Sequence, residues 1–375
     1  MSHEDAGFLF VFSKTYYLCG IKKTEMRKRL LQSVFLLVLA MLFASCKHEV
    51  DLYAEYRELP IIYGLLDTSL DTNYIKITRS FYAHGDATQM ALIPDSSNYP
   101  GRLDVRLAEY CKGRFIREII LDTITIHDKQ EGLFYAPAQK LYYTTEHLQP
   151  NYKDYKYSYI LSVALPDSTL HCETDIVGSR DFKVKSLGVN FSHMYFGTHR
   201  PFYFHPAVNA SYYEIEFKFS FKERRTPDSD SVLRSVSWRV AEHEDKWFAA
   251  HMLEDVYSFT YRPETFWTVL REFLGDDTLT DGVVRYLGDY PMEVSVAACG
   301  KNLWEYMYFN NPVNGIAPGD PEFSLIQGGY GVFSSRRIVH SKLRLGGKTV
   351  PELLENKYYG FSFIGGDWQD ESVEP

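Results

Sequence analysis

The sequence predicts a mainly β protein: an antiparallel, immunoglobulin-like β-sandwich domain followed by a β-rich domain with two short helices. Apolar and polar residues alternate with a period of two in several segments, and the 375 residues include 29 Tyr and 25 Phe. Such alternation buries one face of a strand and leaves the other in solvent, and aromatic residues are common in strands. The 45% hydrophobic and 24% charged content is that of a globular protein.

Residues 46–180 contain a series of strand signals, and we interpret them as the sandwich domain. Segments with alternating or β-rich composition are residues 59–66, 73–81, 103–109, 115–121, 155–165 and 169–176. A turn of Pro, Asp and Ser separates the last two segments, which should therefore form a hairpin. Short strands at this spacing are typical of sandwich domains.

Residues 181–375 form the predicted β-rich domain. Its clearest strand spans residues 213–222, where Tyr, Ile and Phe alternate with Glu, Lys and Ser. A charged turn at residues 223–230 and a second strand at 231–241 would complete a long hairpin. An apolar face and a polar face on each strand indicate a sheet that is covered on one side only.

Two helices are predicted in this second domain. Pro263 suits the first position of a helix over residues 263–274, whose apolar residues fall on one face. Asn302 followed three residues later by Glu305 is a capping signature for a second helix near residues 302–309. The buried stripe expected for this second helix consists of Leu303, Tyr306 and Met307. We interpret the aromatic residues of both helices as core rather than as a ligand platform.

Residues 1–45 have the composition of a leader and a secretory signal. A basic cluster at residues 27–29 is followed by residues 30–45, which carry no charge and are mostly apolar. This run is shorter than the roughly 20 residues that a membrane-spanning helix needs. Residues 1–25 contain Glu4, Asp5 and a spread of polar residues and do not fit a signal peptide, so we expect translation to start at Met26. An unusually long n-region is the alternative.

Phe43, Ala44 and Ser45 directly precede Cys46 and resemble a bacterial lipobox. Processing there would make Cys46 the first residue and the site of acylation, palmitate included. Each buried CH2 would contribute about 0.8 kcal/mol to anchoring in the membrane. An ordinary signal peptide with an incidental cysteine is the alternative. Lys47 and the acidic residues after it partly resemble a surface-display signal, so we expect the outer membrane and leave the leaflet open, periplasmic or surface.

The charge balance is acidic. The net charge of −9 and the pI near 5.8 argue against nucleic acid as a partner. Removal of residues 1–45 leaves 34 basic and 46 acidic residues, a net charge of −12. Three cysteines then remain besides Cys46, and they are Cys111, Cys172 and Cys299. Their wide spacing fits no metal motif, so buried thiols are expected, although one bridged pair is an open alternative.

Motifs for catalysis or cofactor binding are missing from the sequence. It has no GxSxG elbow, P-loop or dinucleotide fingerprint, and we therefore predict no cofactor. His243 and Glu244 begin like a zinc-protease helix, but His251 lies off the required spacing. Three further histidines fall six residues apart and show no ligand pattern: His193, His199 and His205. We assign no catalytic, cofactor-binding or metal residue, and Cys46 is the one assigned site.

Two acidic segments offer oxygen ligands for a cation, but both favour solvated turns. Asp276, Asp277 and Asp281 miss the calcium-loop pattern, because the twelfth position counted from Asp277 is Gly288 rather than an acid. The second segment is a predicted hairpin turn that contains Asp67, Asp71 and Asn73. Paired carboxylates for glycoside hydrolysis need no proximity in sequence, so no pattern tests for them.

Three segments of the chain carry short motifs, which are LPIIYGLL at residues 59–66, YIKITRSF at 74–81 and QGGYGVF at 327–333. With these motifs the chain resembles a family of Bacteroidota envelope lipoproteins known only as a domain of unknown function, and the resemblance would cover most of residues 46–345. These motifs are short and structural, so they imply a family and a compartment but no reaction. Genes of this family often neighbour TonB-dependent outer-membrane transporters, which implies a transporter as a partner.

Three functional hypotheses follow. The favoured one is a non-catalytic, lipid-anchored binding or accessory protein, with an exposed apolar or aromatic patch at one end of a sandwich. The second is an envelope hydrolase acting on glycan or peptide, with two convergent carboxylates or a His beside a nucleophile. The third is an adhesin or fimbrial component that pairs sheet edges with a neighbour.

Overall fold

The computed structural model describes residues 58–81, 87–127, 138–185, 193–226, 229–275, 283–311, 324–346, 348–354, 361 and 363–365. The chain divides into two compact units, residues 1–57 and 58–375, and all described residues belong to the second. The leader, Cys46 and the loop that contains Asp276, Asp277 and Asp281 therefore lie outside the described residues.

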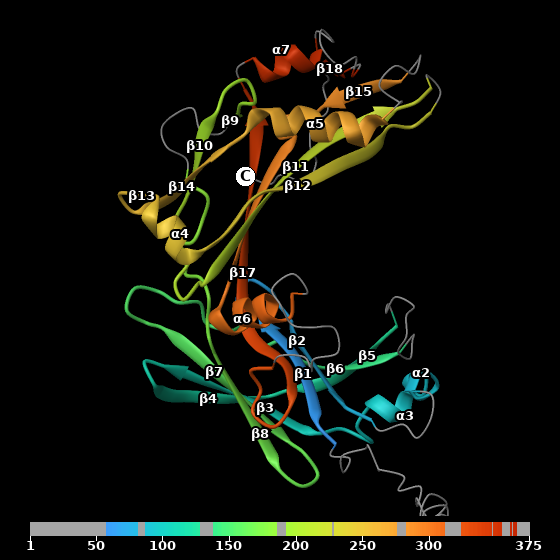
Figure 1. Ribbon diagram of the computed structural model, residues 1–375, viewed down its shortest axis with the longest axis vertical. Helices are drawn as coiled ribbons and strands as arrows, with labels where there is room; N and C mark the ends of the chain where they lie inside the picture. The colour runs from blue at the N-terminus through green and yellow to red at the C-terminus, as the bar shows by residue number, and fades with distance from the viewer. Residues whose placement is uncertain are drawn as a thin grey trace, which may run out of the picture. The chain divides into compact units, whose positions relative to one another are not determined.

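The first half of the described chain is built of short strands (Figure 1). Its elements are β1 Pro60–Leu66, β2 Asn73–Arg79, α2 Ala87–Ala91, α3 Pro94–Ser97, β3 Asp104–Cys111, β4 Arg114–Ile120, β5 Asp122–Ile126, β6 Gln139–Thr144, β7 Tyr157–Ala164 and β8 Thr169–Asp175. All six strands predicted here are confirmed, and β7 and β8 pair antiparallel as the expected hairpin. One sheet has the order β4-β3-β7-β8, while β1, β2, β6 and β5 belong to a larger sheet.

The second half contains longer strands and most of the helices. Its elements are β9 His193–Met194, β10 Arg200–Phe204, β11 Tyr212–Arg224, β12 Val232–Glu244, α4 Asp245–Ala250, β13 Met252–Leu253, β14 Val256–Tyr261, α5 Pro263–Leu274, β15 Val284–Leu287, β16 Met292–Cys299, α6 Lys301–Phe309, β17 Tyr330–Leu345, α7 Thr349–Leu354 and β18 Phe363–Gly365. β11 pairs antiparallel with β12 on one side and with β16 and β15 on the other. The predicted long hairpin is thus confirmed.

The fold is mainly β, with several antiparallel sheets, as predicted. Buried apolar residues form two clusters. The first takes Ile62, Ile75 and Tyr142 from the large sheet and side chains of β3, β4, β7 and β8 from the four-stranded sheet. The second gathers the alternate residues of β11 and β16 under α4 and α5. The immunoglobulin-like topology and the domain boundary near residue 180 stay predictions.

The two predicted helices differ in outcome. α5 has the predicted bounds, begins at Pro263 and buries Phe266, Trp267 and Leu270. α6 forms where expected, but none of its side chains is buried, and Met307 is 41% exposed. The predicted buried stripe and the core role of its aromatic residues are therefore wrong. Its ring contacts lie at the surface instead, because Trp304 stacks on the half-buried ring of Tyr212 at a centroid distance of 4.3 Å.

The predicted cap of α6 is also wrong. Its N-cap residue is Gly300, and the hydroxyl of Ser334 on β17 accepts a hydrogen bond from the Leu303 amide at 3.1 Å. A distant strand thus supplies the acceptor that a helix start needs. The side chain of Asn302 is used elsewhere, as a donor to the carbonyl oxygens of Glu173 and Phe333.

β17 joins the two halves of the described chain. Its residues from Tyr330 to Ser335 pair in parallel with β1, and those from Arg336 to Leu343 pair antiparallel with β16. Figure 1 shows it as one long strand that runs beside α6. Gly331 makes the parallel pairing possible, because its φ is +100° and a Cβ there would collide with the carbonyl oxygen of Ile62.

Gly331→Ala is expected to destabilise the protein by several kcal/mol, because a methyl group would force β17 away from β1. Gly328→Ala is the matched control: it also has a positive φ, of +79°, but nothing lies within 4 Å of the added Cβ. The control should lose only the backbone strain of about 1–3 kcal/mol. Urea unfolding measures both variants, and equal losses would contradict the close approach of β17 to β1.

Candidate functional site

The histidines and acids singled out in the sequence do not converge. His205 lies 3.5 Å from Asp255, while His199 lies 4.0 Å from Glu264 and is exposed. His193 is in β9, which pairs with the end of β17. Among the described residues, no group of three or more His, Cys, Asp or Glu side chains could hold a metal ion.

His243 and His251 both stack against Trp247 of α4, with centroid distances of 3.9 and 4.1 Å. Nδ1 of His251 also lies 2.7 Å from the Trp247 carbonyl oxygen. Burial lowers the pKa of His243, so this imidazole is neutral at pH 7. The pair therefore packs around an indole ring, and its ring nitrogens do not meet at a shared ligand position.

The predicted turn between β1 and β2 is confirmed as a hairpin turn. The Asp67 amide donates to Oδ1 of Asn73 at 2.7 Å, and Nδ2 of Asn73 donates to the Asp67 carbonyl oxygen at 3.2 Å. Oδ1 of Asp67 also accepts from the amide and hydroxyl of Ser69. The polar side chains of this segment therefore serve the turn itself.

Two serine–histidine pairs have the spacing of a nucleophile and a base, but not the arrangement. Ser295 Oγ lies 2.9 Å from Nδ1 of His340, and Oε1 of Glu293 lies 3.2 Å from that same nitrogen. A hydrolytic triad needs the serine and the acid on opposite ring nitrogens. In the second pair, Ser162 and His171 face each other across β7 and β8 at 2.9 Å. Within the described residues, no acid holds the other nitrogen of His171.

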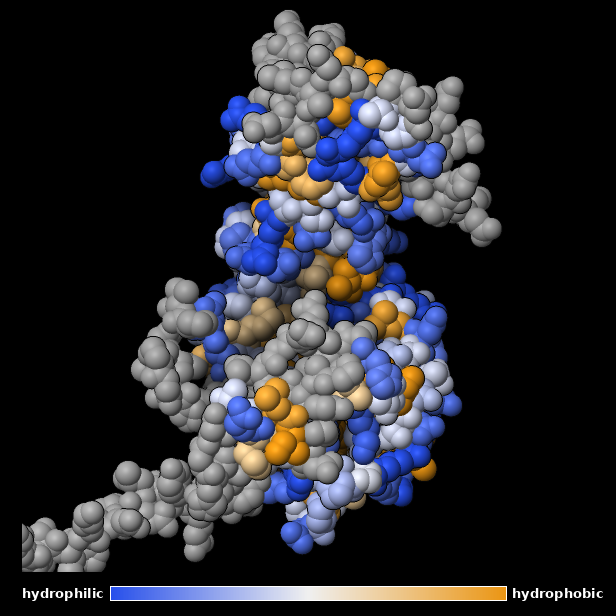
Figure 2. All heavy atoms as spheres, turned by 90° about the vertical axis from the view of Figure 1, so that its right-hand side faces the viewer, coloured by the Kyte–Doolittle hydropathy of each residue, from blue (hydrophilic) through white to orange (hydrophobic). Residues whose placement is uncertain are grey.

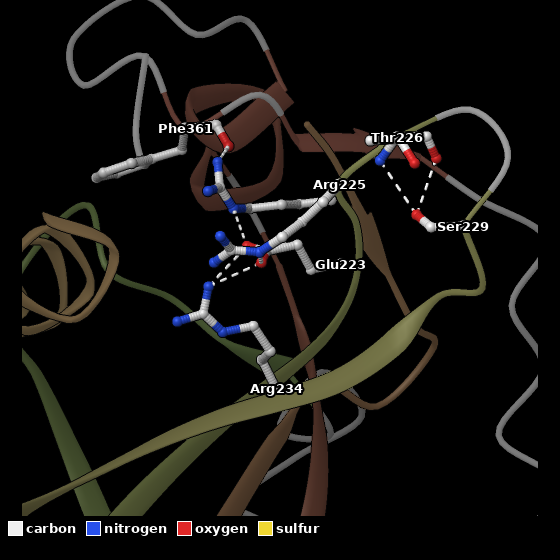
Figure 3. Close-up of polar contacts among 7 residues, drawn as sticks. Glu223, Arg225, Thr226, Ser229, Arg234 and Phe361 are labelled. Atoms are coloured by element: carbon white, nitrogen blue, oxygen red, sulfur yellow. Dashed lines mark hydrogen bonds and ion pairs between the residues drawn. The ribbon is translucent and has the colours of Figure 1, made fainter. Parts of the chain in front are cut away.

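A buried ion cluster lies at the end of β11 (Figure 3). The Glu223 carboxylate is 3% exposed and accepts hydrogen bonds from Arg225, Arg234 and Arg285, at 2.8–3.1 Å. Arg285 is fully buried and also donates to the carbonyl oxygen of Phe361 at 2.7 Å. The cluster thus ties β11, β12 and β15 to the segment at Phe361.

The charged turn predicted for residues 223–230 is wrong for Glu223, which lies in β11 and is buried. β11 continues to Arg224, and the position of Glu223 in its alternation points the side chain inward. Burial alone would raise the pKa of Glu223, but the hydrogen bonds and charges of Arg234 and Arg285 outweigh it and hold the pKa below its ordinary value of 4.5. The carboxylate therefore stays charged and has a structural role.

The most promising binding site is a cleft of about 360 Å³ along β8. This volume lies within the roughly 300–1,000 Å³ of known ligand sites. The apolar residues that line it are Ile160, Cys172, Leu325, Ile326 and Phe333. The polar residues that line it are His171, Glu173, Asn302 and Gln327. A second cavity of about 290 Å³ shares Glu173 and Asn302 with it.

β8 is the last strand of its sheet, and the cleft runs along its outer edge. Its carbonyl oxygens at Glu173 and Asp175 accept hydrogen bonds from Asn302 of α6 and Ser335 of β17, at 3.0 and 2.5 Å. These contacts cover one end of the edge. Beyond them, toward His171, no strand of the described part of the chain pairs with this edge.

The three remaining cysteines are buried and free, as expected. Burial raises the pKa of the Cys172 thiol, which lines the cleft, to about 12. At neutral pH the thiol is protonated and therefore a poor nucleophile. The cleft consequently offers hydrogen-bonding groups and apolar surface, but no activated nucleophile among its described residues.

Exposed aromatic residues do occur at one end of the four-stranded sheet, in the loop before β7. Tyr155 lies under the Lys112 ammonium group at 4.6 Å, and Tyr152 lies 5.2 Å from the Arg180 guanidinium. These rings already serve cation–π contacts. On the face that Figure 2 shows, hydrophobic residues form small separate groups within a largely hydrophilic surface.

Comparison of the chain with protein-family models and with curated proteins found no match. No helix in the described ranges combines the length and the apolar character that crossing a bilayer requires. Of the residues that line the cleft, sequence analysis named Asn302 as a helix cap, Cys172 as a buried thiol, and Gln327 and Phe333 within the QGGYGVF motif, but none of them as a binding residue. The signal in the sequence that could have identified His171 and Glu173 is their position on the polar side of the alternation along β8.

Glu223→Gln is expected to lower the free energy of unfolding by about 3–5 kcal/mol at pH 7, because it removes the carboxylate that faces buried Arg285. The depressed pKa of Glu223 means that its contribution is present above pH 4.5 and is lost as the pH falls through the folded-state pKa. The deficit of the variant should therefore shrink below pH 4.5, as urea unfolding at several pH values can measure.

Glu242→Gln provides the matched control, since Glu242 is exposed and bonds Arg239 at the surface. It should change the free energy of unfolding by less than about 1 kcal/mol. Equal deficits in the two variants, or a Glu223→Gln deficit that does not change with pH, would contradict the role given to the cluster.

Proposed function

We propose that this protein is a lipoprotein, anchored through Cys46 in the outer membrane of a Bacteroidota cell envelope, with a non-catalytic binding or accessory role. A TonB-dependent transporter is the partner that the family resemblance suggests. The observation that carries the binding role is the cleft along β8, which combines an open sheet edge with apolar walls.

The anchor is supported by sequence and by the division of the chain. The basic cluster, the apolar run and the small residues before Cys46 form the pattern of a lipoprotein signal. Cys46 lies in the unit of residues 1–57, upstream of the compact unit that begins at Glu58. Acylation at Cys46 would leave the binding body intact and tether it at the membrane.

The immunoglobulin-like sandwich of residues 46–180 belongs to the same proposal. Its support is that the four-stranded sheet and the strands β1, β2 and β6 contribute to one apolar cluster, with alternate residues such as Leu161, Val163 and Ile75 buried. Polar residues alternate with them on the outer faces. Two sheets that face a shared core are the architecture of such domains.

A hydrolase is less well supported. Both serine–histidine pairs use Nδ1 for the serine, and neither has an acid at the opposite ring nitrogen among the described residues. The buried Glu109 accepts from Tyr159 and Arg117 at 2.9 and 3.1 Å, so its carboxylate is held by structural contacts. A binding role needs none of these groups to be activated.

A clickable palmitate analogue should label the wild-type protein in its native host and should not label Cys46→Ser, because the thiol at position 46 is the proposed acylation site. Cys299→Ala removes a different, buried thiol and should be labelled like the wild type. In-gel fluorescence after immunoprecipitation provides the measurement. Label that persists in Cys46→Ser, or none in the wild type, would overturn the anchor.

Affinity purification from detergent-solubilised outer membranes is expected to recover a TonB-dependent transporter with the wild-type protein. We expect this recovery because the lipid anchor raises the local concentration of the folded domain near a partner in the same membrane. Quantitative mass spectrometry should show at least about tenfold enrichment over an unrelated outer-membrane lipoprotein carrying the same tag. Without such enrichment, the transporter would be dropped as the partner.

A further inference from the structure

We propose that the outer edge of β8 is a strand-addition site for an extended partner segment in which apolar and basic residues alternate. This inference deepens the proposed binding role and rests on it. It is argued from three features of the described residues: the direction of the backbone groups of β8, the apolar wall of the cleft and the charge along its rim.

The backbone of β8 is half paired. The Ile176 amide bonds the Tyr157 carbonyl oxygen, and the Leu165 amide bonds that of Ser168. The antiparallel register between these two bonds directs the backbone groups of Leu170, Cys172 and Thr174 toward β7. Those of the odd residues, Thr169 to Asp175, point outward. The carbonyl oxygens of Glu173 and Asp175 accept hydrogen bonds from side chains. From the Glu173 amide back to Thr169, no strand among the described residues pairs with the outward backbone groups.

The cleft has a wall where an added strand would lie. Leu325, Ile326 and Phe333 line it opposite β8, and Cys172 points to the same side. Side chains of an added strand alternate between the two faces of the sheet. Every second residue of the segment would therefore face this apolar wall, and apolar side chains would be favoured at these positions.

The other face of the added strand would meet acidic side chains. Glu173 and Asp175 project from the exposed side of β8 and line the two cavities. Lys301 is the basic residue among their lining residues, and it already pairs with Glu305 at 3.5 Å. The rim thus carries an excess of negative charge, which favours Lys or Arg at the alternate positions of the partner segment.

β4, at the opposite edge of the same sheet, offers an internal control. The Leu121 amide bonds the Val105 carbonyl oxygen, so the backbone groups of Glu118 also point away from the neighbouring strand β3. Proline at such an outward position removes no bond of the ladder. His171→Pro and Glu118→Pro therefore each remove one outward backbone N–H at the two edges, but only the first removes a donor from the cleft.

Binding of a fluorescein-labelled Lys-Val-Lys-Val-Lys-Val peptide to the full mature protein tests the proposal by fluorescence anisotropy. We expect saturable binding below about 1 mM. Methylation of the peptide's alternate backbone nitrogens should weaken it about tenfold, because pairing with β8 is lost. A Glu-Val-Glu-Val-Glu-Val peptide should bind at least about tenfold more weakly than the lysine peptide, because its charges face Glu173 and Asp175.

The protein variants complete the experiment. His171→Pro should weaken binding of the lysine peptide about tenfold, and Glu118→Pro should change it less than about twofold. Two results would rule out the edge of β8 as the site. One is an affinity for the lysine peptide that N-methylation does not change, and the other is an equal loss of affinity in Glu118→Pro and His171→Pro. N-methylation changes the peptide alone, so the comparison of the two peptides on the wild-type protein remains valid even if a protein variant folds poorly.

Failure of this inference is distinguishable from failure of the proposed function. No binding of the lysine peptide at about 1 mM, with palmitate labelling of Cys46 and transporter recovery intact, would reject strand addition and leave the lipoprotein role standing. Peptide binding with the expected sensitivities, in a protein whose Cys46 is unlabelled, would leave the edge site standing and reject the anchor.

Discussion

The pairing of β17 with two different strands is the constraint on which the described structure depends. Its first part extends the sheet beside β1, and its second part completes the sheet beside β16. At the change of partner, Ser334 and Ser335 are fully buried, and their hydroxyl groups bond α6 and the end of β8. The strand thus joins the β16 side and the β1 side of the large sheet, and its Phe333 lines the cleft.

Buried polar side chains such as those of Glu223 and Asn151 have hydrogen-bond partners within the fold. Glu223 is surrounded by arginines that keep it charged, and Asn151 donates to the carbonyl oxygens of Ile176 and Gly178. Burying such groups without partners would cost several kcal/mol each. The Asn151 contacts hold the residues that follow β8, and the Glu223 contacts tie β11, β12 and β15 together. The edge of β8, by contrast, keeps backbone groups that a partner strand can use.

Local patterns predicted β1–β4, β7, β8, β11, β12, α5 and α6, while contacts between distant residues decided the site. Alternation over residues 213–222 and the apolar face of residues 263–274 sufficed to place β11 and α5. The burial of Glu223 depends on Arg285, 62 residues away, and the use of Asn302 depends on Glu173, 129 residues away. No local period carries such information, which is why the charged turn and the cap of α6 were predicted wrongly.

The open edge of β8 is the central claim, and amide hydrogen exchange tests it most directly. In the isolated mature protein, the His171 amide should exchange much faster than that of Cys172, which pairs with β7. In the protein recovered with its envelope partners, the His171 amide should become protected while Cys172 stays unchanged. A His171 amide as slow as that of Cys172 in the isolated protein, or equally fast in both preparations, would contradict the account.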